Sequence, residues 1–203
     1  MHDLTVLELD ALAEIFNISV GRSASALSEL TQEPVTMSVP VVHVMPIQRV
    51  VELLSPGIGA ERLTCVSQMF NGSFAGEAML MFPENSSLEI VRLMLGSQVP
   101  IEQLSEIEQD ALSEIGNIIL NACFSTIADM LQDTFSCELP ELTVASVEDI
   151  LRKPESEQTV LFIQIQLALE SRSLEGYLAF IMGGESEANL QQALRGFLNG
   201  VQD

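Results

Sequence analysis

Positive charge is scarce in this chain. Of its 203 residues, eight are Lys or Arg and 29 are Asp or Glu, which gives a formal net charge of −21. Proteins that bind nucleic acid or anionic lipid normally do so through clusters of Lys and Arg. We therefore expect neither nucleic acid nor a membrane surface among its partners.

Cysteine and long apolar runs are scarce as well. Cys65, Cys123 and Cys137 are an odd number and lack the spacing of metal ligands, so we expect reduced, mostly buried thiols in a cytoplasmic protein. No apolar run approaches the ~20 residues that span a bilayer, and the N-terminus lacks the basic and apolar regions of a secretory signal. We expect no membrane insertion. With 47% hydrophobic residues, the chain can still build a substantial core.

What the chain does have is an internal repeat. Residues 5–18 read TVLELDALAEIFNI, and residues 105–118 read SEIEQDALSEIGNI. Eight residues recur, identical, one hundred positions later, and the same offset relates Pro40 to Pro140. Such self-similarity indicates two structural units of one kind.

Both repeats predict the same order of elements. Periodicity indicates a long helix over about 5–31 and again over 105–132, each opened by a capping-box pattern, Thr5-x-x-Glu8 and Ser105-x-x-Glu108. An extended segment, a short helix, a hairpin of two strands and a closing helix follow. The predicted ranges are 35–46, 47–54, 61–70, 76–83 and 85–96, then 137–147, 147–152, 159–170, 175–182 and 185–196, with turns at 71–73 and 171–173.

These elements predict a single α+β domain, 1–203, built from two α-β-(α)-β-β-α repeats of about 1–100 and 101–203. A two-stranded hairpin is not stable alone. We therefore expect the six strands to share one core, related by a pseudo-two-fold axis.

Each long helix also carries a narrow polar stripe. At about 100° per residue, Asp10, Glu14 and Asn17 fall within about 60° of one another on the helical wheel. The second helix repeats the stripe and extends it by one turn: Asp110, Glu114, Asn117 and then Asn121, where the first helix has Gly21. The residues on the opposite, presumed core side are Leu12, Ile15 and Phe16 in the first helix and Leu112, Ile115 and Ile119 in the second.

A solvated face of an amphipathic helix would also be polar. Asn, however, is a mediocre residue in a helix interior. Both copies keep Asp, Glu and Asn while other exposed positions differ, as Leu9 does from Gln109. A task common to the two stripes explains this better.

The motif resembles that of the CheC/CheX/FliY family of chemotaxis phosphatases. That family is marked by an acidic residue or Ser, then E-x-x-N, then a proline 23 residues after the Asn. Here the pattern occurs as Asp10-x3-Glu14-x2-Asn17-x22-Pro40 and as Asp110-x3-Glu114-x2-Asn117-x22-Pro140. Two complete copies are most similar to two-site, CheC-like members. FliY-like members add a C-terminal flagellar-switch domain, which we do not expect in this protein. The resemblance implies a six-stranded, largely antiparallel sheet with two long site-bearing helices on one side.

The resemblance further implies a hydrolase acting on the aspartyl phosphate of a CheY-like response regulator. An amide does not titrate near neutral pH, but it can accept and donate hydrogen bonds and so orient a water molecule, as a glutamine does in small GTPases. Asn17 and Asn117 would take this role. Glu14 and Glu114 would either form a salt bridge with the regulator's lysine or act as general bases. The chain has no phosphate-binding GxxxxGK[ST] loop, His-rich metal site or arginine in the stripes; we expect it to have no cofactor of its own, with Mg²⁺ held by the partner.

The remaining motif residues are expected to contact the partner. Asp10 and Asp110 lie one turn before each Glu, Asn121 extends the second stripe, and Pro40 and Pro140 would shape a rim at a strand edge or bend. Two alternatives stay open. One is a docking module that binds the phosphorylated regulator without accelerating hydrolysis. The other is an adaptor for a CheD-like receptor deamidase, with the acidic segment 147–150 as a candidate surface.

Overall fold

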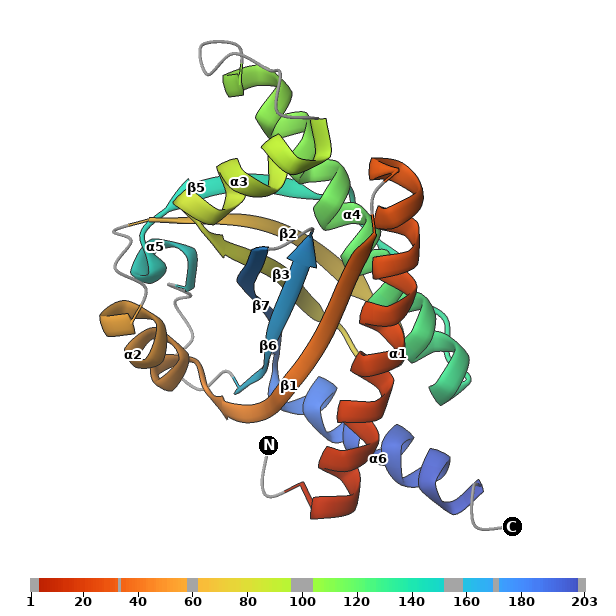
Figure 1. Cartoon of the computed structure of the whole chain (residues 1–203). Helices are drawn as coiled ribbons and strands as arrows, with labels where there is room; N and C mark the ends of the chain where they lie inside the picture. Colours follow the sequence, from red (N-terminus) through yellow and green to blue (C-terminus); the bar gives the residue numbers. More distant parts are fainter. Residues whose placement is uncertain are drawn as a thin grey trace.

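The computed structural model describes residues 4–32, 34–57, 62–95, 104–151, 159–169 and 172–200. They form one curled antiparallel sheet with helices on both of its faces (Figure 1). The elements are α1 (Val6–Thr31), β1 (Val35–Pro46), α2 (Ile47–Gly57), β2 (Leu63–Asn71), β3 (Gly76–Pro83), α3 (Glu84–Leu95), α4 (Leu104–Leu131), β4 (Ser136–Cys137), β5 (Glu141–Ala145), α5 (Val147–Leu151), β6 (Thr159–Leu169), β7 (Arg172–Met182) and α6 (Gly184–Gly200). The predicted α+β class and order of elements are confirmed.

The two long helices end alike but begin differently. At the start of α1 the backbone N–H of Thr5 donates to Glu8 Oε2 at 2.7 Å, and the N–H of Glu8 donates to Thr5 Oγ1 at 3.3 Å, which confirms the capping box. The second capping box is wrong, because α4 begins at Leu104 and Ser105 is already inside the helix. Gln32 and Gln132 follow the two helices with φ of 59° and 53°, the left-handed conformation that ends many helices.

The sheet exchanges strands between the two halves of the chain. Its order is β1-β6-β7-β3-β2, with β4 and β5 both paired to β2. The hairpins β2–β3 and β6–β7 meet at the central β3–β7 pair, while the first strand of each half pairs with the hairpin of the other, β1 with β6 and β5 with β2. If each strand of one half is replaced by its counterpart in the other half, the strand order of the sheet is unchanged. Descent from a duplication stays a prediction, and this pairing is what such a duplication would produce.

Prolines interrupt both outer strands of the sheet. In β1 the register with β6 shifts between Ser38 and Val41, around Pro40. In the second half the expected strand over 137–147 is broken into β4 and β5, with Pro140 between them, so the sheet has seven strands rather than six. Proline has no N–H to donate, which confines it to edges and bulges.

The hairpin turn of the second half also differs from expectation. Leu169 pairs with Arg172 and Ala168 with Ser173, so Arg172 and Ser173 belong to β7 and not to the predicted turn over 171–173. Residues 170 and 171 lie outside the described residues.

The apolar core lies in two parts, one on each face of the sheet. The larger part contains residues of β1, β2, β3, β6 and β7, so the strands of both halves share a core as expected, and the smaller part is an addition that was not predicted. The larger part joins the sheet to α1 and α4, with Ile15 and Ile115 fully buried. The smaller part lies under α2 and α5 and includes Val50 and Ile150. Both faces of the curled sheet are apolar, so each needs a cover of its own.

Two of the three cysteines are buried. Cys65 and Cys123 lie in the core, whereas Cys137 is exposed in β4, and none of the three is in a disulfide. Burial raises the pKa of Cys123 to about 12, so this thiol is neutral at physiological pH.

Within α4 the stretch Glu108–Leu131 is long and apolar enough to cross a membrane by length and composition alone. Half of that stretch is buried inside the fold, where its apolar side packs on the sheet. A core helix of this length passes the same test, so we assign its hydropathy to core packing.

Candidate functional site

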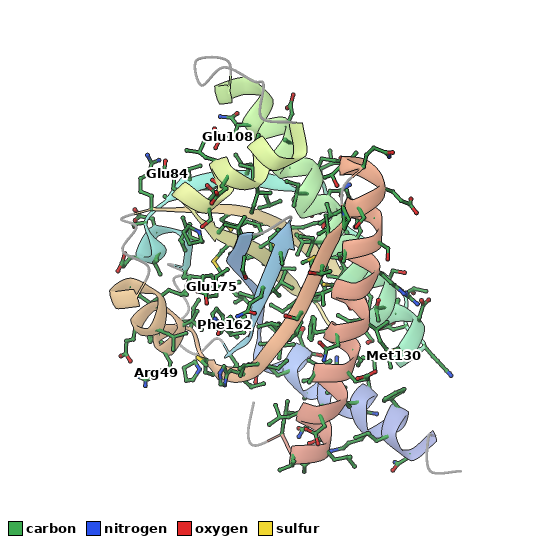
Figure 2. The ribbon with its side chains drawn as sticks, in the orientation of Figure 1. Arg49, Glu84, Glu108, Met130, Phe162 and Glu175 are labelled. Carbon is green, nitrogen blue, oxygen red and sulfur yellow. The ribbon has the colours of Figure 1, made fainter. Side chains whose placement is uncertain are left out.

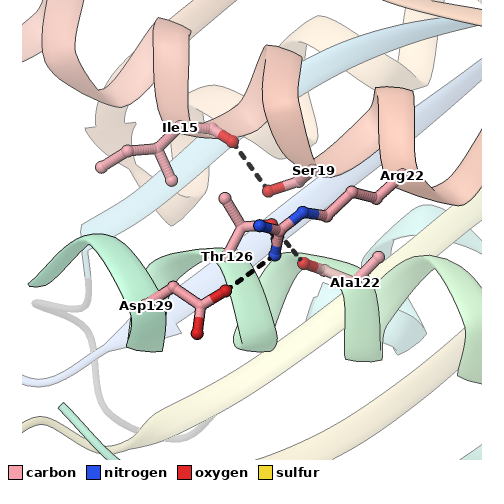
Figure 3. Close-up of polar contacts among 6 residues, drawn as sticks. All are labelled: Ile15, Ser19, Arg22, Ala122, Thr126 and Asp129. Carbon is pink, nitrogen blue, oxygen red and sulfur yellow. Dashed lines mark hydrogen bonds and ion pairs between the residues drawn. The ribbon is translucent and has the colours of Figure 1, made fainter. Parts of the chain in front are cut away.

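The helices α1 and α4 lie side by side on one face of the sheet and run in opposite directions (Figure 1). Arg22 Nη1 of α1 donates to Asp129 Oδ2 of α4 at 2.9 Å and to Thr126 Oγ1 at 3.3 Å (Figure 3). Buried hydroxyls at this contact are satisfied within their own helices, since Ser19 donates to the carbonyl of Ile15 and Thr126 to that of Ala122, both at 2.8 Å. Sequence patterns did not reveal this contact because its partners are more than one hundred residues apart.

The two helices pack on the sheet differently. At Gly116 of α4, an added Cβ would lie 2.4 Å from Val66 Cγ1 of β2, so the helix backbone rests directly on the strand. The matching position of α1 is Phe16, whose ring is fully buried with its centroid 5.4 Å from that of Phe180. A phenyl ring thus separates α1 from the sheet where α4 has only a hydrogen atom.

The polar stripes face away from the core. Asp10, Glu14 and Asn17 are exposed on α1. On α4, Asp110, Glu114 and Asn121 are exposed and Asn117 is half-buried. The predicted core residues opposite them are all buried: Leu12, Ile15, Phe16, Leu112, Ile115 and Ile119. The helical periodicity therefore placed both faces correctly.

Each stripe gathers its residues on one helix, but the two stripes are separate. Both lie N-terminal to the contact between Arg22 and Asp129. Because α1 and α4 run in opposite directions, the stripes occupy opposite sides of that contact. The fold thus presents two exposed surfaces of similar chemistry and does not combine them into one cleft.

One contact distinguishes the second stripe from the first. The Nδ2 of Asn121 donates to Oδ1 of Asn117 at 2.7 Å. Residues four apart on a helix are neighbours on its surface, so the spacing of Asn117 and Asn121 in the sequence indicated that their side chains lie close together. Gly21 stands at the matching position of α1 and has no side chain.

One motif proline lies in a strand that borders a site helix, and the other lies directly before such a strand. β1, which contains Pro40, contacts α1, and β5, which follows Pro140, contacts α4. Pro140 is half-buried in the segment between β4 and β5. The backbone of Pro40 lies at the register shift of β1.

A glutamate precedes each stripe, and the two have opposite environments. Glu8 is only 2% exposed, and its burial alone would raise its pKa. Hydrogen bonds from the Thr5 backbone and from Arg195 outweigh this effect and lower the pKa overall. The Nε of Arg195 lies 2.8 Å from Oε1 of Glu8. Glu108 lies near Glu84 of α3 (Figure 2), and burial together with this second negative charge raises its pKa. The helix α6 thus anchors the start of α1 through Arg195.

Positive charge near the site is already paired. Four arginines have side chains that the structure describes, and each forms an ion pair with a carboxylate outside the stripes: Arg22 with Asp129, Arg49 with Glu52, Arg62 with Glu84 and Arg195 with Glu8. Within the described residues, the stripes consist of carboxylates and amides. Such a surface can bind a cation, accept hydrogen bonds or orient water.

Several known proteins have sequences similar to this chain. The CheC-like family matches residues 7–44, a segment that contains the first stripe and Pro40. The chain is 26% identical to the CheY-P phosphatase CheC of Bacillus subtilis over 141 residues, covering 68% of this chain and 66% of that protein. The chain is thus similar to CheC-like proteins, through the family model over residues 7–44 and through the Bacillus CheC over a longer stretch.

A second relative matches over a similar share of the chain. The flagellar motor switch phosphatase FliY of Bacillus subtilis is 26% identical over 151 residues, covering 73% of this chain but only 39% of that protein. The chain therefore spans just under two thirds of the Bacillus CheC and well under half of the Bacillus FliY.

Solved structures share the CheC-like fold across nearly the whole chain. The crystal structure of Thermotoga maritima FliY has a TM-score of 0.77 at 20% identity and covers 97% of this chain and 98% of that chain. The FliG–FliM complex from H. pylori has a TM-score of 0.69 at 12% identity, with 92% and 99% covered. The CheX–CheY–BeF3–Mg²⁺ complex from Borrelia burgdorferi has a TM-score of 0.51 at 15% identity, with 84% and 97% covered. At these identities the likeness shows the fold alone.

Proposed function

We propose that this protein is a phosphatase that accelerates hydrolysis of the aspartyl phosphate of a CheY-like response regulator in the cytoplasm. The observation that carries the proposal is the Asp-Glu-Asn stripe, present twice and open to solvent on two helices of a CheC-like fold. The name of the Bacillus relative, CheY-P phosphatase, indicates the substrate.

The reaction requires little chemistry from this chain. A water oxygen forms a bond to phosphorus while the bond between phosphorus and the aspartate oxygen breaks, which releases inorganic phosphate and a free carboxylate. Phosphoryl transfer has a loose transition state, so positioning of the water and neutralisation of charge provide most of the acceleration. Asn17 and Asn117 orient the water by accepting its hydrogen bond with Oδ1.

The charge neutralisation comes from the substrate. The phosphorylated regulator brings Mg²⁺ and a lysine, and Glu14 or Glu114 binds that lysine and so anchors the regulator. This division of labour agrees with the paired arginines, because each of the four that the structure describes forms its ion pair with a carboxylate outside the stripes. It also agrees with the Borrelia structure of this fold, in which CheX is in complex with CheY, BeF3 and Mg²⁺.

Substitution of the amides tests the proposal. We expect Asn17→Ala with Asn117→Ala to abolish accelerated phosphate release from an acetyl-phosphate-charged regulator with Mg²⁺, while each single change leaves the other site active. Gln109→Ala, an exposed change on α4 away from the stripe, serves as the control. Full activity in the double variant would refute the catalytic assignment. Tight binding of the phosphorylated regulator without faster hydrolysis would favour a docking module instead.

Substitution of the glutamates separates anchor from base. In a variant with one active site, Glu114→Gln keeps the shape of the side chain and removes its charge. Loss of an anchor raises KM with little change in kcat, whereas loss of a general base lowers kcat. We expect the change in KM.

An adaptor role toward a CheD-like deamidase stays a prediction. In the candidate segment, Val147 and Ile150 are buried in the smaller core, and Glu148 and Asp149 are exposed. A docking surface there would therefore be small and acidic. Reversal of both charges, Glu148→Lys with Asp149→Lys, should abolish such binding and leave the phosphatase reaction unchanged.

A further inference from the structure

The amides of Asn117 and Asn121 form a pair that the first stripe lacks. Asn121 Nδ2 donates to Asn117 Oδ1 at 2.7 Å, and Asn117 is half-buried while Asn17 is exposed. On α1 the position of Asn121 is taken by Gly21, where an added Cβ would meet no atom within 4 Å. Gly21 is thus not required by packing.

The hydrogen bond has a definite chemical consequence. The carbonyl oxygen of an amide has two lone pairs, and its nitrogen has two N–H groups. Asn121 occupies one lone pair of Asn117 and determines which end of the amide is the oxygen. The second lone pair stays available to accept a hydrogen bond from water, and both N–H groups of Asn117 stay available for phosphoryl oxygens.

A side chain that is already held in place loses less conformational freedom when it enters the transition state. The amide of Asn17 has no such partner on the next turn and must be ordered when the regulator binds. We propose that Asn121 is a positioning residue that pre-orients Asn117 and makes the second site the faster of the two. This inference rests on the proposed phosphatase function.

Reciprocal exchange of the two residues tests it. Asn17→Ala leaves only the second site active, and Asn117→Ala leaves only the first. With the second site alone, Asn121→Gly should lower kcat roughly three- to tenfold, the effect of freeing one ordered side chain, with KM little changed. With the first site alone, Gly21→Asn should raise kcat by a similar factor.

Further variants separate the hydrogen bond of the Asn121 amide from the effect of each substitution on helix stability. Gly21→Ala fills the same open position without an amide and should leave kcat of the first site unchanged. Asn121→Ala is a better helix former than Asn121→Gly, yet both should lower kcat of the second site alike. Asn121→Gln, which keeps the donor, should restore part of the loss.

The outcomes distinguish this inference from the function on which it rests. If Asn117→Ala abolishes activity of the second site but Asn121→Gly and Asn121→Ala leave kcat unchanged, the positioning role is refuted and the phosphatase function stands. A rise in KM alone would make Asn121 a contact residue and also refute it. If Asn117→Ala leaves activity of the second site intact, the proposed function itself fails.

Discussion

A single methyl group at Gly116 tests how the second site helix is held on the sheet. In Gly116→Ala the new Cβ would lie 2.4 Å from Val66 Cγ1 and 2.6 Å from Val66 Cβ. Carbon atoms pack at about 3.5–4.0 Å, so α4 would have to move by roughly 1 Å. Val66 is 3% exposed in β2 and β-branched, so it cannot rotate away.

The expected cost follows from these contacts. Overpacking of a core costs typically about 1–3 kcal/mol, and contact with three atoms of a stiff side chain places Gly116→Ala near the upper value. The higher helix propensity of Ala offsets about 1 kcal/mol of this loss. We expect a net loss of about 2 kcal/mol in the free energy of unfolding, measured by urea denaturation followed by circular dichroism.

The same substitution on the other helix is the matched control. At Gly21 the added Cβ meets nothing within 4 Å, so Gly21→Ala should stabilise the protein by about 0.5–1 kcal/mol. Adding Val66→Ala should make Gly116→Ala less costly, with a coupling energy of at least about 1 kcal/mol. If Gly116→Ala is as stable as Gly21→Ala, or shows no coupling to Val66, the close seating of α4 is wrong.

Two further predictions concern charge and thiol chemistry. Arg195→Met leaves the buried Glu8 carboxylate with only its Thr5 partners and should destabilise the protein by about 1–3 kcal/mol at neutral pH. Because the folded-state pKa of Glu8 lies below its usual value of 4.5, this stabilisation is present above pH 4.5 and is lost as the pH falls through the folded-state pKa. If Arg195→Met lowered the free energy of unfolding equally at pH 7 and pH 3, the assignment would be contradicted. Separately, a thiol reagent should modify Cys137 in the native protein and reach Cys65 and Cys123 only after unfolding, so rapid labelling of all three thiols would contradict the packing.

Local pattern was sufficient for much of the fold. The helices over 6–31 and 104–131 have apolar positions at helical spacing, and the hairpin β2–β3 follows from two apolar runs around Asn71-Gly72-Ser73. The capping box at Thr5 was readable because its partners are three residues apart. The pattern at Ser105 looked the same but is not a cap, because a helix start depends on the preceding chain as well as on the capping residue.

The composition of the site was also readable from the sequence. Helical geometry is regular, so residues at positions i, i+4, i+7 and i+11 must share one face, and the repeat marked the same residue types in both halves. Helical geometry and the repeat together predicted two polar stripes opposite the core residues. The first consists of Asp10, Glu14 and Asn17, and the second of their counterparts.

Only the tertiary structure decided how these pieces meet. The exchange of β1 and β5 between the halves, the Arg22–Asp129 contact and the burial of Glu8 against Arg195 all join residues far apart in the chain. The same holds for Gly116, which is a glycine because Val66 occupies the space where its side chain would lie. Sequence periodicity specifies which way a side chain faces, but packing between distant elements specifies what it touches.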